Sequence, residues 1–268
     1  MLQLPTLYVS HGGGPWPWVD GLRQSHANLE AFLVQAPHRI GARPAAVLAV
    51  SAHWEAPAFT ATSAAAPPML YDYYGFPENT YHVNYPAPGA PALARRVQAL
   101  IESAGLPAAL DAERGFDHGT FVPLAVMYPA ADVPVLQLSI RADYDPAAHL
   151  ALGRALAPLR SEGVLILASG FSWHNLGLMS PAAKDPSRRF DDWLQETVLK
   201  SSPEERTRRL LNWSAAPAAR IAHPHEDHLI PLMVAVGAAE SEDAWVVHHD
   251  EAFFGGVVAS SFQFGATG

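Results

Sequence analysis

Short apolar segments alternate along the chain with longer segments in which apolar residues recur at helical spacing. Four apolar runs predict buried strands: Thr6–Ser10, Ala45–Ser51, Val133–Ser139 and Val164–Ser169. Helical spacing and capping residues predict the helices Ser25–Gln35, Pro91–Ala104, Pro146–Arg160, Pro186–Lys200 and Pro203–Leu211. Further strands are expected late in the chain, at Ala244–His249 and Val257–Phe262. This alternation predicts an α/β fold, a single three-layer α/β/α domain with a mostly parallel central sheet.

One segment between these elements fits neither a regular helix nor a central strand. Tyr71–Pro91 contains six aromatic residues and several prolines. Proline cannot donate to a strand ladder, so we expect a long structured loop here. Long loops of this kind in compact domains commonly cover a functional part of the molecule.

The composition is that of one folded domain. The chain has 268 residues, of which 49% are hydrophobic and 16% are charged. It contains no internal repeat and no Ser/Gly-rich linker, so we expect residues 1–268 to form a single domain. The sequence also lacks a run of about eighteen apolar residues and a signal peptide, which predicts a cytoplasmic protein without membrane contact.

Charge and cysteine content exclude several classes of function. The formal net charge is −9, which opposes attraction to phosphates and argues against a nucleic-acid partner. The chain has 13 histidines and no cysteine. Thiolate zinc sites, iron–sulfur clusters and cysteine nucleophiles are therefore excluded, and any transition metal must be held by imidazole and carboxylate groups. The positions of the histidines become the main evidence about function.

Three histidines lie shortly after predicted strands, in turns of small residues. They are His11, His53 and His174, and each comes within five residues of a strand end. Ligands of open α/β sheets bind outside the carboxyl ends of the strands. We therefore expect these side chains to converge in the fold, at a metal site, although the sequence separates them widely.

A fourth candidate element begins at Pro224, which suits the first turn of a helix. Glu226 and Asp227 would then lie near the positive end of that helix. His225 and His228, three residues apart, would share one of its faces. This element can offer either imidazole or carboxylate. It does not have the His-Glu-x-x-His pattern of metalloproteases.

His118 stands between Asp117 and Gly119, just before an apolar helix. Two roles are open to it: an exposed turn residue, or a general acid/base whose imidazole is set by Asp117. Polar or helical contexts indicate surface or structural roles for His26, His38, His82, His149, His248 and His249. Among these, His82 lies in the aromatic loop and could reach a site from there.

Histidines without thiolate suit zinc, iron or copper. Two histidines and a third ligand with open positions are typical of non-haem Fe(II) oxygenases, and a zinc hydrolase is the alternative. The aromatic segment Tyr71–Tyr85 and several tryptophans near the candidate histidines favour a flat aromatic ligand. Those tryptophans are Trp16, Trp18, Trp54 and Trp173.

Several segments, in order along nearly the whole chain, together match the pattern of a known family. They are Ser10-His11-Gly12, Ser51-Ala52-His53-Trp54, Tyr85-Pro86-Ala87-Pro88-Gly89, Gly115-Phe116-Asp117-His118-Gly119, Val135-Leu136-Gln137-Leu138-Ser139, Ala168-Ser169-Gly170, His174-Asn175-Leu176 and the stretch from Pro224 to Leu232. With them the sequence resembles the 4,5-DOPA dioxygenase extradiol family. That family belongs to the class III extradiol ring-cleavage dioxygenases related to protocatechuate 4,5-dioxygenase.

The resemblance implies one catalytic domain over residues 1–268, monomeric or homodimeric, with a divalent metal at the carboxyl ends of the strands. His11, His53 and His228 match metal ligands of the family. His174 matches either a fourth ligand or an acid/base beside the metal. His118 matches a second active-site histidine that contacts substrate or dioxygen.

The implied reaction inserts O2 into a catechol-type ring, either DOPA or a related small aromatic diol, and yields a muconic semialdehyde. Fe(2+) is the metal expected for activity, while Zn(2+) can occupy such a site in purified protein. Related class III enzymes use a glutamate as third ligand, which leaves Glu226 and Asp227 as alternatives to His228. His225 has no counterpart in the family pattern and no assigned role. The competing functions are a zinc-dependent hydrolase and a non-catalytic binding module on the same scaffold.

Overall fold

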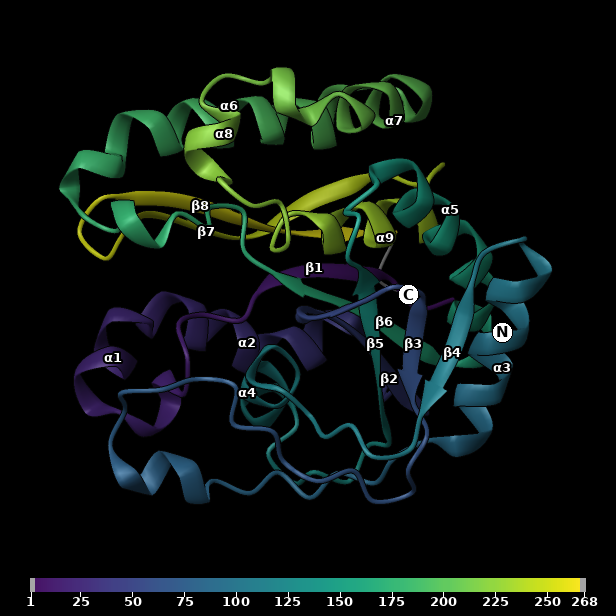
Figure 1. The fold of residues 1–268 in the computed structure, drawn as a ribbon. Helices are drawn as coiled ribbons and strands as arrows, with labels where there is room; N and C mark the ends of the chain where they lie inside the picture. The colour runs from purple at the N-terminus through teal and green to yellow at the C-terminus, as the bar shows by residue number, and fades with distance from the viewer. Residues whose placement is uncertain (1–2, 266–268) are drawn as a thin grey trace.

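An eight-stranded sheet forms the middle layer of the computed structural model, which describes residues 3–265 (Figure 1). The strands are β1 Thr6–Ser10, β2 Ala46–Ala56, β3 Phe59–Thr62, β4 Ala108–Asp111, β5 Val135–Arg141, β6 Val164–Gly170, β7 Ala244–Phe253 and β8 Val257–Phe264. Their order across the sheet is β4-β3-β5-β2-β6-β1-β8-β7. The four central strands run parallel, and antiparallel pairs join β8 to β1, β7 to β8 and β3 to β5. The prediction of an α/β fold with a mostly parallel sheet is confirmed.

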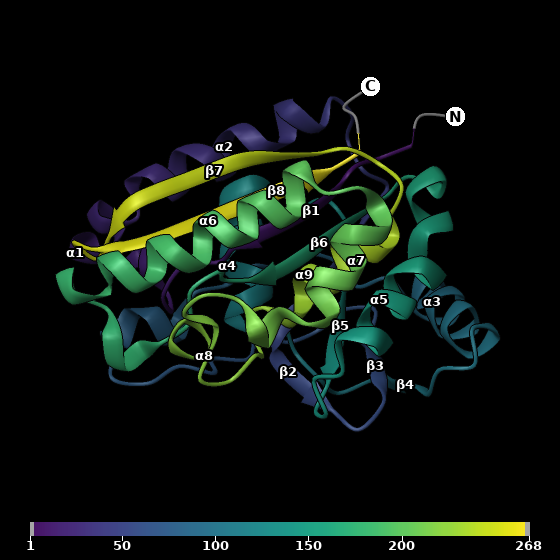
Figure 2. The ribbon, with the colours of Figure 1, turned by 90° about the horizontal axis from the view of Figure 1, so that it is seen from above.

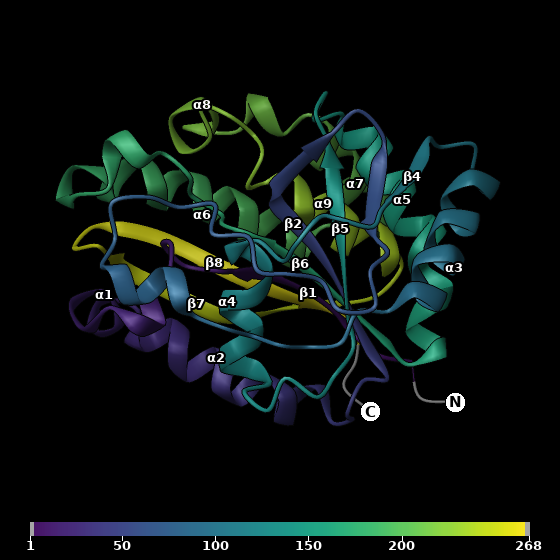
Figure 3. The same ribbon diagram turned by 60° about the horizontal axis from the view of Figure 1, so that its bottom comes forward.

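Helices cover both faces of this sheet. They are α1 Asp20–Ser25, α2 Ala27–Ile40, α3 Pro91–Ser103, α4 His118–Met127, α5 Pro146–Leu156, α6 Lys184–Lys200, α7 Pro203–Leu211, α8 Ala219–Ala222 and α9 Ile230–Ala238. One hydrophobic core lies between the sheet and α2 and α4 (Figure 3), and a larger one lies between the sheet and α3, α5, α6 and α9. Seen from above, α6 lies along β7 and β8 (Figure 2). None of the helices within residues 3–265 is long and apolar enough to span a membrane.

The four apolar runs predicted as strands are the four central strands. A parallel strand inside such a sheet is covered on both faces, so its sequence is apolar almost throughout. In β2, Val47 belongs to the core with α2 and α4, whereas the next residue, Leu48, belongs to the core on the other face. Sequence pattern does not reveal β3 and β4, because each is four residues long and rich in small or polar side chains.

Some predicted boundaries differ from the observed ones. The helix predicted at Ser25–Gln35 begins at Ala27 and continues through Pro37, and it ends where Gly41 adopts a left-handed backbone with φ 74°. The helix predicted at Pro146–Arg160 ends at Leu156, after which the chain tightens into a 3-10 turn. The segment Tyr71–Pro91 is the long structured loop that was expected, with a 3-10 turn at Glu78–His82.

The prediction that a helix begins at Pro224 is wrong. The residues that follow Pro224 form turns, and α9 begins only at Ile230, with Pro231 in its first turn. Both prolines suit a helix start, and the tertiary contacts of the segment decide between them. His225 and His228 consequently do not share a helical face.

The backbone of His228 is bound to the sheet instead. Its carbonyl oxygen accepts hydrogen bonds from Tyr8 Oη at 2.9 Å and from the Phe171 amide at 3.0 Å. A helical turn would have used this carbonyl internally. Gly170 permits the approach, because a Cβ there would collide with the same oxygen. The segment therefore lies close against β1 and β6 before α9 begins.

His53 also differs from its predicted place in a turn. β2 continues beyond Ser51 to Ala56, so His53 is part of the strand. The pairing of β2 with β5 is irregular between Ser51 and Glu55. Such an irregularity re-aims side chains at the end of a strand, which is where His53 turns toward the other histidines.

Candidate metal centre

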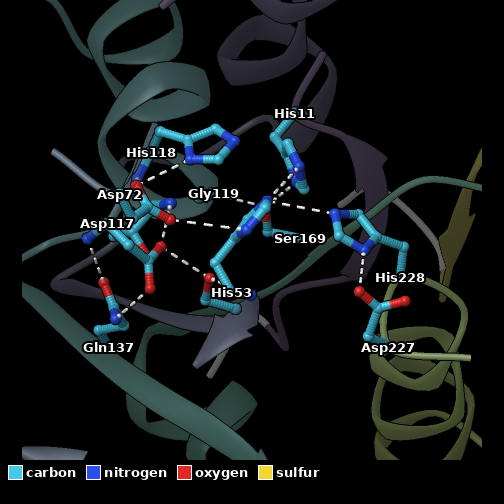
Figure 4. A network of polar contacts seen from close by, with 12 residues as sticks. His11, His53, Asp72, Asp117, His118, Gly119, Gln137, Ser169, Asp227 and His228 are labelled. Carbon is cyan, nitrogen blue, oxygen red and sulfur yellow. Dashed lines mark hydrogen bonds and ion pairs between the residues drawn. The ribbon is translucent and has the colours of Figure 1, made fainter. Parts of the chain in front are cut away.

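Four of the five predicted site histidines meet at the carboxyl ends of β1 and β2 (Figure 4). His11 follows β1, His53 lies in β2, His118 begins α4 and His228 precedes α9. The Nε2 atom of His53 is 3.0 Å from Nε2 of His11 and 3.1 Å from Nε2 of His228. One ring nitrogen each of His11, His53 and His118 also lies within 4.8 Å of the others. The structure therefore brings His11 and His53 together, with His118 and His228 beside them.

The partner of His11 fixes which of its ring nitrogens carries the proton. His11 Nδ1 is 3.0 Å from Ser169 Oγ, and the Ser169 hydroxyl donates its own proton to the Gly119 carbonyl. Ser169 must therefore accept from His11 Nδ1–H, and we assign the unprotonated lone pair to Nε2.

The same reasoning applies to the other two rings. His228 Nδ1 donates to Asp227 Oδ2 at 2.8 Å, and His53 Nδ1 is 3.5 Å from Asp72 Oδ2. Carboxylates accept only, so the His228 ring presents an unprotonated Nε2, and the Asp72 carboxylate that faces Nδ1 of His53 favours the same tautomer there. Nε2 of His53 thus lies close to Nε2 of both His11 and His228. Nitrogen ligands in adjacent positions about 2.0–2.1 Å from one ion are themselves roughly 3.0–3.4 Å apart, so this donor set fits a divalent metal.

Burial keeps these imidazoles in the neutral form that binds metals. Desolvation, followed by the neighbouring histidines, lowers the pKa of both His11 and His53 well below the ordinary value. Burial and the charge of His174 lower the pKa of His228 to about 4, against the opposing effect of Asp227. The imidazoles of His11, His53 and His228 are therefore neutral at neutral pH.

Asp227 and Glu226, the two alternative ligands, lie in different surroundings. Glu226 pairs with Arg220 at 2.6 Å, away from the cluster of Nε2 atoms. Asp227 contacts His228 and lies 3.6 Å from Nδ1 of His174. Burial alone would raise the pKa of Asp227, but its hydrogen bond with His228 and its charge interactions with His228 and His174 outweigh burial and lower it strongly. Asp227 is therefore an ionised partner of histidines.

His174 lies against a member of the cluster. Its ring stacks on that of His228, with centroids 3.3 Å apart and an interplanar angle of 18°. His174 also forms one wall of a pocket of about 470 Å³. The other residues that line this pocket are Glu55, Tyr144, Asn175, Leu176, Gly177, Pro224, His225 and Asp227. His225 is thus placed beside the site.

The imidazole of His118 is not set by Asp117, as one of the two roles left open for it required. Asp117 caps α4 by accepting from the Thr120 amide at 3.2 Å, and it also accepts from Ser51 Oγ and Gln137 Nε2, each at 2.7 Å. His118 Nδ1 instead contacts Asp72 Oδ1 at 2.8 Å. Sequence reasoning missed this carboxylate, although the aromatic loop that carries it was expected to cover something.

Two histidines outside the cluster, His26 and His82, have ordinary structural partners. Buried His26 donates from Nδ1 to the Leu22 carbonyl at 2.7 Å and accepts at Nε2 from the Gly13 amide at 3.1 Å. Its ring stacks flat on Trp16, so it holds the turn that follows His11. His82 is exposed, and its Nε2 lies 3.3 Å from the Glu78 carboxylate, so it does not reach the site.

The sheet topology and the histidine cluster together define a metal-binding α/β enzyme. Residues 5–265 match the family described as the catalytic LigB subunit of aromatic ring-opening dioxygenase, and the chain belongs to that family.

Relatives and a solved structure agree with this assignment. The chain is 37% identical to the 4,5-DOPA dioxygenase extradiol of Beta vulgaris, over 98% of this chain and 97% of that one. It is 36% identical to the protein of the same name in Escherichia coli K12, over 98% and 95%. Dioxygenase tasH of Hapsidospora irregularis is 37% identical, over 92% and 82%. The crystal structure of an uncharacterized Escherichia coli K12 protein superposes with a TM-score of 0.78 at 30% identity, over 98% of this chain and 100% of that one.

These matches confirm the predicted class of enzyme. The chain is a non-haem extradiol dioxygenase of the aromatic ring-opening type. The comparisons give no support to the zinc-hydrolase alternative, and they overturn the alternative of a non-catalytic binding module.

Proposed function

We propose that the enzyme opens the ring of a catechol-type substrate with O2, at a divalent metal held by His11, His53 and His228. The observation that carries this proposal is the set of three Nε2 atoms with successive separations of 3.0 and 3.1 Å. We propose Fe(II) as the working metal, with zinc able to occupy the same nitrogens. Bound Fe(II) would bring the diol and O2 together and supply the electron transfer that O2 chemistry needs.

The protein's own part is to move protons and to orient groups. A catechol must release hydroxyl protons when it binds, and imidazole is suited to accept and return protons near neutral pH. We propose His118 and His174 as the two acid/base residues. The His118 ring is 3.9 Å from that of His53, and the His174 ring is stacked on that of His228. Asp227 orients the rings of His174 and His228 and is not assigned as a ligand.

The pocket beside His174 is our proposed position for the ring substituent. Glu55 and Tyr144 line it together with His225, and burial and the Glu55 carboxylate raise the pKa of the Tyr144 hydroxyl. None of the described residues that line it is lysine or arginine. We therefore propose that the pocket favours catechols with a cationic or neutral substituent. The relatives named for DOPA make DOPA-like catechols the first candidates.

Three further points belong to the proposal. The whole activity is assigned to one catalytic domain over residues 1–268, whose outermost residues lie outside the described range. The enzyme is expected to work as a monomer or homodimer, which light scattering of the purified protein will measure. Its location is expected to be cytoplasmic.

The decisive experiment loads the protein with Fe(II) anaerobically and then adds air with DOPA, caffeate, protocatechuate or simple catechol. O2 uptake with a yellow product is the expected result for at least one diol. A fully loaded protein that consumes no O2 with any of them would overturn the proposal. Zinc-loaded protein is the matched control and should consume none, because zinc has no redox chemistry.

A further inference from the structure

The aromatic loop brings one carboxylate into the histidine cluster. Asp72 Oδ1 accepts from the backbone amide of His118 at 2.9 Å and contacts Nδ1 of the same residue at 2.8 Å. Its other oxygen, Oδ2, is 3.5 Å from Nδ1 of His53. The Asp72 side chain is 18% exposed, so little water competes for these contacts. Asp72 thus contacts one proposed metal ligand and one proposed acid/base residue.

The opposite side of the cluster repeats this arrangement. Asp227 contacts Nδ1 of His228, a proposed ligand, and faces Nδ1 of His174, a proposed acid/base residue. Metal-binding histidines commonly donate a hydrogen bond to a carboxylate from the ring nitrogen that does not bind the metal. Here each carboxylate also lies next to a histidine that we propose as an acid/base residue.

The loop is built so that Asp72 keeps its place. The neighbouring tyrosines are both anchored: Tyr71 Oη donates to the Val83 carbonyl at 2.7 Å, and Tyr73 Oη donates to the Thr80 carbonyl at 2.6 Å. Before them, the Leu70 amide donates to the Phe116 carbonyl at 2.9 Å, which joins the loop to the segment that leads into α4.

We propose that Asp72 is a positioning residue that sets two rings at once. It holds the Nδ1–H of His118 and the Nδ1–H of His53, so that each ring presents an unprotonated Nε2 to the site. Through it, the aromatic loop becomes part of the metal centre. The inference rests on the proposed metal site, and it concerns ring orientation and metal affinity.

Asp72→Asn tests the proposal because it keeps the shape and removes one acceptor. The amide oxygen of asparagine can serve His118, but its NH2 group then faces the Nδ1–H of His53, donor to donor. His53 is expected to move its proton to Nε2, where it opposes the other two ligands. We expect the Kd for zinc, measured by chelator competition, to rise about 10- to 100-fold. Ring 15N shifts in NMR of the metal-free protein should show the changed tautomer of His53.

Glu78→Gln is the matched control. It removes a contact between a carboxylate and His82 in the same loop, at 3.3 Å but fully outside the site. Its zinc Kd should stay within about twofold of wild type. Asp72→Glu is the second variant; it retains the charge, so a zinc Kd closer to wild type than that of Asp72→Asn is expected even if the asparagine variant folds poorly.

Wild-type zinc affinity together with unchanged ring tautomers in Asp72→Asn would overturn the proposal. Equal weakening by Asp72→Glu and Asp72→Asn would also overturn it, because the loss would then not follow the carboxylate charge. Neither readout needs ring-opening activity. If the wild type binds zinc but opens no catechol ring, the proposed function fails while the role of Asp72 can still hold.

Discussion

Two kinds of buried histidine occur in this enzyme, and burial does not distinguish them. Desolvation lowers the pKa of both His228 and His149 to about 4. His149 donates from Nδ1 to the Asp145 carbonyl at 2.7 Å and accepts at Nε2 from the Arg141 amide at 3.1 Å, so both nitrogens are satisfied by backbone. His228 has a protein partner for Nδ1, whereas its Nε2 faces another unprotonated Nε2.

The difference shows where to look for a ligand. A low pKa reports only that water is excluded, which is true of both kinds. The informative observation for this pair is the second nitrogen: in His149 it accepts from a backbone amide, and in His228 it faces Nε2 of His53. Substitutions of the two kinds should therefore fail in different ways.

The largest effect is expected from His53→Ala. Removal of the central Nε2 breaks both close contacts of the cluster, so metal content should fall from roughly one ion per chain to near zero. Elemental analysis of the purified protein measures this. His149→Gln is the control and should keep its metal. A His53→Ala protein with the metal content of wild type would remove His53 from the ligand set.

The next largest effect concerns His174. If His174 is an acid/base residue, the variant His174→Ala should have a kcat about 10²- to 10⁴-fold lower than wild type. Its metal content should stay near that of wild type. Stopped-flow and steady-state O2 uptake with Fe(II)-loaded protein give kcat and KM. Loss of the metal in this variant would make His174 a ligand, and wild-type turnover would exclude both roles.

A smaller effect is expected from His149→Gln, and it should appear in stability. Loss of its two backbone partners should cost about 1–3 kcal/mol of the free energy of unfolding at pH 7. Urea denaturation monitored by circular dichroism measures this cost. His38→Gln, on the exposed end of α2, is the matched control and should change it little.

The free energy of unfolding of wild type, compared with that of His149→Gln, should depend on pH with a definite sign. Burial holds the pKa of His149 at about 4, below the ordinary value of about 6.5 in an unfolded chain. As pH falls from about 6.5 to about 4, the unfolded chain binds the proton first, so stability decreases. The difference in free energy of unfolding between wild type and His149→Gln should narrow across this window, by up to roughly 3 kcal/mol. A difference that stays constant with pH would show that His149 titrates normally.

The smallest effect is expected at the substrate pocket. Glu55 is exposed, so its charge is partly screened, and Glu55→Gln should change substrate preference by only about two- to fivefold. The variant should lose kcat/KM with dopamine, gain it with 3,4-dihydroxyphenylacetate and leave 4-methylcatechol unchanged. A uniform change for all three diols would assign Glu55 a structural role.

Sequence pattern predicted the parts of this enzyme that depend on local chemistry. The central strands are visible because both of their faces are buried, and the histidines at strand ends follow from the parallel topology. His228 could not be placed correctly, because the choice between Pro224 and Pro231 as helix start depends on contacts with β1 and β6. Asp72 could not be found, since it comes from an irregular loop and meets His118 across 46 residues.

The attachment of the His228 carbonyl to β1 and β6 has a consequence for synthesis. His11 and His53 leave the ribosome early, but β6 lies between β1 and β2 in the sheet, and the segment of His228 docks on β1 and β6, so the three nitrogens can meet only after β6 and His228 have been made. A nascent chain can therefore hold a metal ion only loosely until most of the protein has been made. The centre therefore forms late in synthesis, and the order of the strands along the chain sets its timing.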